Sequence, residues 1–329
     1  MTATPQADAP GGPALSPAGQ SCWVDLDGPV HYLDYGGLPG SPVIVCVHGL
    51  GGSALNWSAI APLLTGDYRL LAPDLAGHGL TQSWGRGTDV LANQRLLHRF
   101  IDAVPGCPVI LMGNSMGGMI SLLEASAAAS TVAGLILLDP ALPFAFGRPD
   151  PQVAVMFAMY VTPGLGRVMQ RRQRRLSEHE IVAGILSLCC ADPSRVPAEI
   201  IARHVELARQ RSEFTEAARD FAAAMRSVVA TIGYGRGRAY RRGIRTITCP
   251  VLLVHGDRDR LVPIAVARAA ARANPSWSLA WLTGVGHVPH LEAPRETAGV
   301  ITAWLGSAGR RAAESATPPT RRSEPRPPA

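Results

Sequence analysis

A single serine stands between glycines in a stretch suited to nucleophilic chemistry. Residues 109–118 read Val-Ile-Leu-Met-Gly-Asn-Ser-Met-Gly-Gly, so Ser115 follows a short apolar run and precedes an apolar segment. The spacing Gly113-x-Ser115-x-Gly117 is typical of a strand that turns sharply into a helix, with the serine exposed at the turn. A Cβ atom at position 113 or 117 would collide with the neighbouring strand or helix, which explains the glycines. We therefore predict that Ser115 is a nucleophile; an ordinary glycine-rich turn is the alternative.

A serine hydroxyl needs an adjacent general base to become a nucleophile, and that base needs a third group to hold its tautomer. The chain has nine histidines. We select His287, because it follows the last predicted strand on a loop whose glycines, Gly284 and Gly286, permit close approach. Of the other histidines, His48 precedes a glycine loop and is interpreted as structural, and His255 lies inside an apolar strand. His31 on the early hairpin and the helical His98, His179 and His204 are interpreted as surface or packing residues. His78 and His290 lie on loops without a strand end.

Three aspartates could supply the acid. Asp257 and Asp259 both follow the apolar run at residues 250–256. A loop needs a few residues to swing towards the histidine, so Asp259 is preferred to Asp257. Asp139 ends the preceding strand and is the third candidate.

Acyl-transfer chemistry also needs two backbone N–H groups aimed at the developing oxyanion. One is predicted to come from Met116, at the positive end of the helix that follows the nucleophile. The other is predicted to come from Leu50, within the flexible sequence His48-Gly-Leu-Gly-Gly52. A simple tight turn is the alternative interpretation of that glycine loop.

The surrounding pattern alternates between strands and helices. Continuous apolar runs such as Val43–Val47 are typical of parallel strands that are buried on both faces. Helices are predicted over Asn56–Leu64 and Asp89–Val104, the latter with an apolar stripe. Strands are predicted at residues 21–27, 30–35, 43–47, 68–72, 109–112, 134–139, 250–256 and 278–282. This order favours an α/β fold with a mostly parallel eight-stranded sheet flanked by helices.

The alternation stops between residues 143 and 247, where the sequence shows no convincing strand. Helices are predicted there at 152–161, 164–175, 177–189, 197–209 and 213–232, and Ser177-x-x-Glu180 fits a capping box. We interpret this block as an inserted, all-helical cap over the carboxyl edge of the sheet. Open α/β sheets bind their ligands at that edge.

Composition bounds the class of protein. The formal charge of +6 comes from arginine alone, because the chain has no lysine, and we attribute this bias to coding composition. The six cysteines lack metal or redox spacing, so we predict reduced thiols, no metal, no cofactor and a cytoplasmic location. No run approaches the roughly 18 apolar residues of a membrane span. Arginines at 171–175 and 236–245 accompany no nucleic-acid motif and are interpreted as a solvated face.

The chain divides into five predicted segments. Residues 1–20 and 307–329 are rich in Pro with Ala and Gly, or with Arg and Ser, and are expected to be a disordered leader and a disordered tail. Residues 21–142 and 248–306 form the two parts of the core, and residues 143–247 form the cap.

Five motifs in order resemble those of the capped α/β-hydrolase superfamily, over about residues 21–306. They are His48-Gly-Leu-Gly-Gly52, Asp74-Leu-Ala-Gly-His-Gly79, Gly113-Asn-Ser-Met-Gly-Gly118, Gly256-Asp-Arg-Asp259 and Gly286-His-Val-Pro-His-Leu-Glu-Ala-Pro294. The resemblance implies a serine esterase or lipase-like enzyme, since dehalogenases and epoxide hydrolases of this fold use aspartate as the nucleophile. The serine-bearing turn Gly113-Asn-Ser-Met-Gly-Gly118, here called the elbow, is also similar to that of meta-cleavage-product carbon–carbon hydrolases. Those enzymes usually have a different oxyanion loop and a tryptophan where Val288 stands.

Three functions therefore remain open. The first is a carboxylesterase or lipase acting on small apolar esters, the second a carbon–carbon hydrolase of dienoates, and the third a non-catalytic small-molecule-binding protein. The predicted partner is a small apolar ester, with no nucleic acid and no stable membrane insertion; a homodimer is compatible with the sequence. A fluorophosphonate probe separates the third function from the others, because only an activated serine reacts with it.

Overall fold

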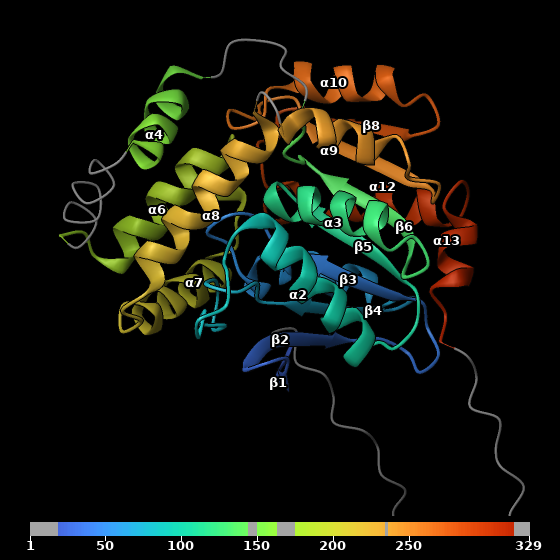
Figure 1. Cartoon of the computed structure of the whole chain (residues 1–329), viewed down its shortest axis with the longest axis horizontal. Coiled ribbons are helices and arrows are strands. Elements are labelled where there is room, and N and C mark those ends of the chain that lie inside the picture. Colours follow the sequence, from blue (N-terminus) through green and yellow to red (C-terminus); the bar gives the residue numbers. More distant parts are fainter. Residues whose placement is uncertain (1–18, 144–149, 163–174, 234–235, 319–329) are drawn as a thin grey trace, which may run out of the picture.

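Eight strands form one sheet, as the sequence predicts, in a computed structural model that describes residues 19–143, 150–162, 175–233 and 236–318 (Figure 1). Each strand lies within two residues of its predicted position. Their bounds are β1 (Gln20–Asp25), β2 (Pro29–Gly36), β3 (Val43–Val47), β4 (Arg69–Pro73), β5 (Val109–Asn114), β6 (Val132–Leu138), β7 (Val251–Gly256) and β8 (Ser278–Leu282).

The order of the strands in the sheet is β1-β2-β4-β3-β5-β6-β7-β8. Strand β2 runs antiparallel to both of its neighbours, and every pair from β4 to β8 is parallel. The carboxyl ends of six strands therefore meet at one edge. Loops that are far apart in the sequence are brought together there.

The apolar runs are continuous because alternate residues enter two different cores. In β3, Val43, Val45 and Val47 join one hydrophobic cluster, whereas Ile44 and Cys46 join the other. The first cluster contains side chains of α2 (Val90–Ala103), α3 (Met116–Ala127), α9 (Arg236–Ile244) and α10 (Ile264–Ala273). The second contains side chains of α1 (Ala61–Leu64), α12 (Pro294–Leu305) and α13 (Arg310–Ser315). The sheet is thus covered by helices on both faces (Figure 1).

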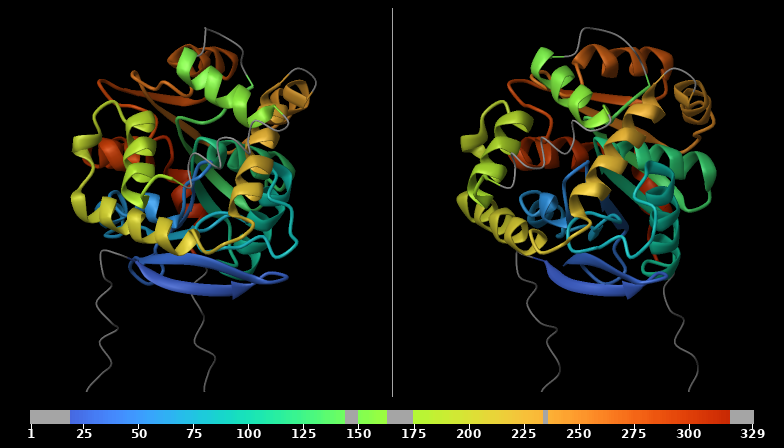
Figure 2. Two further views of the ribbon diagram at one scale, coloured as in Figure 1. Left: turned by 90° about the vertical axis from the view of Figure 1, so that its left-hand side faces the viewer. Right: turned by 60° about the vertical axis from the view of Figure 1, so that its left-hand side comes forward.

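A set of helices lies between β6 and β7 and projects beyond the sheet, on the left in Figure 1 and towards the viewer in Figure 2. These are α4 (Pro151–Val161), α6 (Glu178–Cys189), the short 3₁₀ turn η2 (Pro193–Arg195), α7 (Ala198–Arg211) and α8 (Ala217–Ile232). The described residues of this insert contain no strand, in agreement with the predicted helical cap. Ser177 and Glu180 make the predicted capping box at the start of α6. The predicted helix at 164–175 lies outside the described residues except for Arg175.

Two local predictions were wrong, and one helix was not predicted. The expected helix at 56–64 is split into a 3₁₀ turn, η1 (Ala54–Trp57), and α1, because Pro62 cannot supply the amide that an unbroken helix requires. Helix α9 was not predicted; its Tyr240 and Ile244 are buried in the core. Helix α13 lies inside the expected disordered tail, and Ala312 is buried there against the sheet. Among the described helices, none combines the length and apolarity needed to cross a bilayer.

Candidate active site

Ser115 lies between the end of β5 and the start of α3. Its backbone is in the left-handed region, with φ 54° and ψ −117°, which is uncommon for a residue with a side chain. A Cβ atom on Gly117 would overlap the carbonyl oxygen of Val47, and one on Gly113 would lie 2.6 Å from Gly117. Both glycines are therefore required by close backbone packing, as the sequence predicts, and the tight turn constrains Ser115.

His287 and Asp259 lie side by side at the same sheet edge. The Nδ1 atom of His287 is 2.7 Å from Oδ2 of Asp259, and both residues are buried. The other oxygen of Asp259 accepts the backbone N–H groups of Leu261 and Val262. Burial raises the pKa of Asp259, but the charge and hydrogen bond of His287 outweigh it and leave that pKa below its ordinary value. An ionised Asp259 accepts a proton from Nδ1 of His287, which leaves Nε2 of the ring free to accept one.

Asn114 connects the serine turn to the histidine loop. Its Nδ2 atom donates to the carbonyl oxygen of His287 at 2.9 Å and to that of Leu138 at 3.0 Å. Asn114 precedes Ser115, so this amide fixes the position of His287 relative to Ser115. Sequence reasoning missed this role, because the two bonded residues are 173 positions apart in the chain.

The other two acid candidates occupy different environments. Asp257 is exposed and accepts the N–H of Gly284. Asp139 is buried and accepts the N–H of Gly256 at 2.9 Å. In the described part of the chain, Asp259 alone of the three hydrogen-bonds to the His287 ring.

The glycine loop after β3 packs directly on Ser115. A Cβ atom on Gly49 would lie 3.1 Å from the Cβ atom of Ser115. Among the described residues, the N–H groups of Leu50 and Met116 donate to no protein acceptor, which leaves both available to an oxyanion. His48 has a structural role, as expected, since its ring bonds to the carbonyl of Gly49 and to the N–H of Leu75.

Comparison with known proteins identifies the family. Residues 44–300 match the model of the alpha/beta hydrolase family. The chain belongs to this family. It is 27% identical over 269 residues to the pimeloyl-[acyl-carrier protein] methyl ester esterase of Aromatoleum aromaticum, covering 79% of this chain and 96% of that protein.

Two further relatives show the extent of the likeness. The chain is 26% identical over 276 residues to the biotin biosynthesis bifunctional protein BioHC of Teredinibacter turnerae. That match covers 81% of this chain but only 45% of the relative. The crystal structure of a putative lipase from Acinetobacter baumannii shares the fold, with a TM-score of 0.73, 23% identity and coverage of 89% and 93% of the two chains.

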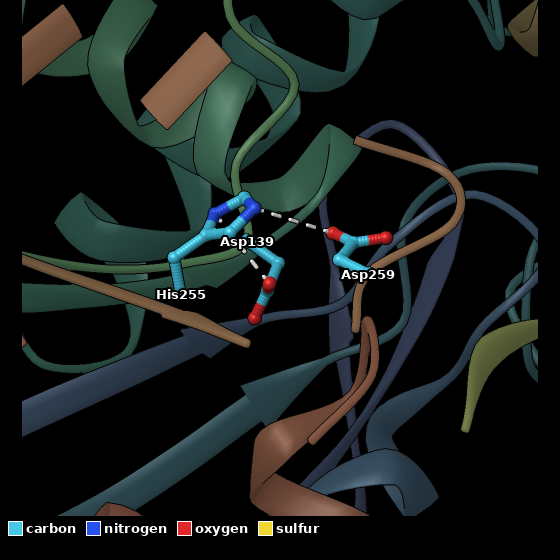
Figure 3. A group of neighbouring side chains, drawn as sticks. All are labelled: Asp139, His255 and Asp259. Atoms are coloured by element: carbon cyan, nitrogen blue, oxygen red, sulfur yellow. Dashed lines mark ion pairs between the residues drawn. The ribbon is translucent and has the colours of Figure 1, made fainter. Parts of the chain in front are cut away.

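Two further ionisable side chains, Asp139 and His255, lie beside Asp259 and form a buried cluster with it (Figure 3). His255 bridges the two aspartates, with Nδ1 at 3.5 Å from Asp139 and Nε2 at 3.7 Å from Asp259. Burial and the nearby charge of Asp259 raise the pKa of Asp139 well above its ordinary value, and burial lowers the pKa of His255. Both shifts favour the neutral forms of Asp139 and His255, and Asp259 is the member of the cluster that contacts His287.

The same three groups could also hold a small cation. Asp139, His255 and Asp259 each offer one ligand atom, and these atoms lie within 4.8 Å of one another. Such an ion would compete with His287 for the carboxylate of Asp259.

The cap holds the histidine loop through backbone hydrogen bonds. The N–H of His287 donates to the carbonyl of Cys189, at the end of α6, at 2.6 Å. Glu292, on α11 (Pro289–Glu292), accepts the N–H of Gly286 in the core as well as those of Ala191 and Asp192 in the insert. Gly286 is needed here, because a Cβ atom would overlap the Cys189 carbonyl. The sequence motif contained Glu292 but did not reveal this contact.

Proposed function

We propose that this chain is a serine hydrolase that cleaves carboxylic esters of apolar acyl chains through an acyl-enzyme on Ser115. The observation that carries the proposal is the buried His287–Asp259 pair, which the Asn114 amide fixes beside the constrained serine turn. Nucleophile, base and acid come from three loops at one sheet edge, in the order typical of this family. The relatives named above as esterase and lipase agree with ester chemistry.

In the proposed reaction, Oγ of Ser115 attacks the ester carbonyl carbon while Nε2 of His287 takes the hydroxyl proton. Asp259 stabilises the imidazolium that forms. The N–H groups of Leu50 and Met116 bind the oxyanion of the tetrahedral intermediate. The intermediate expels the alcohol, which receives the proton from His287. Water then attacks the acyl-enzyme by the same route and regenerates Ser115.

The apolar substrate class rests on the cap. Phe221 of α8 lies against the glycine loop, because a Cβ atom on Gly51 would be 3.0 Å from its ring. Ala224 and Val228, further along α8, pack into the core cluster and fix the helix. A hydrocarbon chain buried against the Phe221 ring would gain about 0.8 kcal/mol per CH₂.

The test is a series of nitrophenyl esters of increasing acyl length. We expect kcat/KM to rise a few-fold per methylene from acetyl to about hexanoyl or octanoyl, and then to level off when the pocket is full. A ring-cleavage dienoate, run at the same enzyme concentration, is the comparison substrate. Its carboxylate should make it poor in an apolar pocket. Faster turnover of the dienoate than of every ester would replace the esterase proposal with carbon–carbon bond hydrolysis.

A further inference from the structure

A second chain of serine, histidine and aspartate lies near the edge of the sheet, apart from Ser115. Oγ of Ser21 is 2.9 Å from Nε2 of His31, and Nδ1 of His31 is 2.7 Å from Oδ2 of Asp74. Ser21 is exposed, whereas His31 and Asp74 are 4% and 1% exposed. Both contacts fall within the range for a nucleophile hydrogen-bonded to its base and a base hydrogen-bonded to its orienting acid. Sequence reasoning treated His31 as a surface or packing residue.

The sheet register brings the first two groups together. Strands β1 and β2 pair with Ser21 opposite Leu33 and Trp23 opposite His31, so Ser21 and His31 are diagonal neighbours on one face. The ring of Trp23 packs edge-on against His31, with 5.1 Å between ring centroids. The backbone N–H of His31 donates to Oγ1 of Thr81 at 2.9 Å. The backbone of His31 is therefore held by Thr81, and its ring is held by Trp23.

Asp74 follows β4 and is surrounded by donors. Its Oδ1 atom accepts the N–H of Ala54 at 2.7 Å, and its Oδ2 atom accepts that of Leu80 at 2.8 Å. Burial alone would raise the pKa of Asp74. The hydrogen bond and charge of His31, together with the other donors, outweigh burial, so the pKa of Asp74 lies below its ordinary value. An ionised Asp74 accepts the Nδ1 proton of His31. Nε2 then remains an acceptor for the hydroxyl of Ser21.

These three residues line a cavity of about 390 Å³ between the core and the cap. Leu55 of the core and Leu207 of α7 supply apolar walls, and Arg203 and Glu206 of α7 add charges of opposite sign. Figure 2 shows α7 running above the β1–β2 hairpin on this side of the molecule. The volume lies in the range of small-molecule sites. Among the described residues, neither Ser115 nor His287 lines this cavity.

We propose that Ser21 is a second nucleophile, with His31 as its base and Asp74 as its orienting acid, and that this cavity accepts small esters. Oγ of Ser21 forms a bond to the ester carbonyl carbon as its proton passes to Nε2 of His31. The bond from that carbon to the alcohol oxygen breaks, and the alcohol leaves with the proton from His31. Water then releases the acid and restores Ser21.

The test uses the full chain with Ser115→Ala, which removes the first nucleophile. A fluorophosphonate probe, whose fluoride leaves as the serine oxygen binds phosphorus, is added, and the modified peptide is located by mass spectrometry. We expect an adduct on Ser21 that is absent in Ser115→Ala/Ser21→Ala and at least tenfold slower in Ser115→Ala/His31→Gln. The control variant is Ser115→Ala/Ser130→Ala, which also removes one exposed serine. In this variant the probe should label Ser21 at the same rate as in Ser115→Ala.

Two outcomes would overturn the proposal. One is the absence of any Ser21 adduct in Ser115→Ala. The other is labelling of Ser21 that His31→Gln does not slow, which would indicate indiscriminate reaction of an exposed hydroxyl. Because His31 is buried, its variant is compared by circular dichroism and melting temperature, and Ser21→Ala leaves the His31–Asp74 pair intact. Labelling of Ser115 in the unmodified chain tests the first site separately, so failure of one site is distinguishable from failure of the other.

Discussion

At the scale of single residues, the backbone of Ser115 is constrained from both sides. Its N–H donates to the carbonyl of Leu138, and its own carbonyl accepts the N–H groups of Met119 and Ala141. The side chain takes no part in these bonds. Removing the hydroxyl should therefore abolish reaction at Ser115 without disturbing the turn.

We expect Ser115→Ala to lower kcat for nitrophenyl hexanoate by several orders of magnitude, because loss of a triad nucleophile removes the covalent pathway. The melting temperature should remain close to that of the unmodified chain. Steady-state kinetics and differential scanning calorimetry provide the two measurements. Retention of more than about a tenth of the original rate would show that another group acts as the main nucleophile.

The three aspartates should respond differently to replacement by asparagine. Asp259→Asn leaves His287 in the wrong tautomer and should lower kcat roughly 10⁴-fold. Asp139→Asn should change it only a few-fold, because the raised pKa of Asp139 favours its neutral form, which asparagine resembles, and the amide oxygen can still accept the Gly256 N–H. Asp257→Asn is the exposed control. A larger loss in either control than in Asp259→Asn would move the orienting acid to that residue.

At the scale of elements, the contact between α2 and α3 contains a buried carboxylate. Glu124 of α3 accepts from Nδ1 of His98 on α2 at 2.7 Å and from Thr131 at 3.1 Å. Asp102 also faces the His98 ring, at 3.4 Å from Nε2. The hydrogen bond and charge of Glu124, aided by Asp102, raise the pKa of His98 above its ordinary value.

This contact predicts a pH-dependent stability. A raised histidine pKa contributes stability that is fully present below the unfolded value of about 6.5 and is lost as the pH rises through the folded pKa. We expect His98→Gln to lower the free energy of unfolding in urea at pH 5.5 more than at pH 8.5. His179, exposed on α6, supplies the matched His179→Gln control, which should show no such difference. Equal destabilisation at both pH values would contradict the charged pair.

Prediction from sequence succeeded where the signal was local. The strands follow from apolar runs buried on two faces, and the elbow follows from glycines adjacent to Ser115. Prediction from sequence failed where packing between distant parts of the chain determines the structure. Helix α9 has a strongly basic sequence, so the two residues that bury it against α3 gave a weak signal. The hydrogen bonds of Asn114 to His287 and of His31 to Asp74 join residues 173 and 43 positions apart, beyond the reach of any local pattern.

At the scale of the whole molecule, the end of the described chain, α13 and Ala316, packs on one face of the sheet. The carbonyl of Ala316 accepts the N–H of Val43 at 3.0 Å. Ala312 fits over Gly134 of β6, where an added Cβ atom would be 2.6 Å from it. Helix α13 thus covers strands that begin far earlier in the sequence.

A chain that ends at Gly306 should therefore be less stable than the full chain. It loses α13, the bond to Val43 and the cover over β6. We expect its melting temperature to fall by several degrees, since each kcal/mol corresponds to about 2–4 °C in a protein of this size class. A chain that ends at Pro318 keeps all the contacts described for α13 and is the control. An unchanged melting temperature for the shorter chain would show that α13 contributes nothing to stability.

The hydrogen bonds between residues 189–192 and the His287 loop limit the ways in which such a protein can acquire new substrate specificities. The loop takes backbone partners from an insert, so the insert is not a freely exchangeable module. Recombination that replaced the whole insert would remove the carbonyl that holds the base and leave the carboxylate of Glu292 short of two donors. New specificities should therefore arise by substitutions within α7 and α8, or by exchange of fragments that leave residues 189–192 in place.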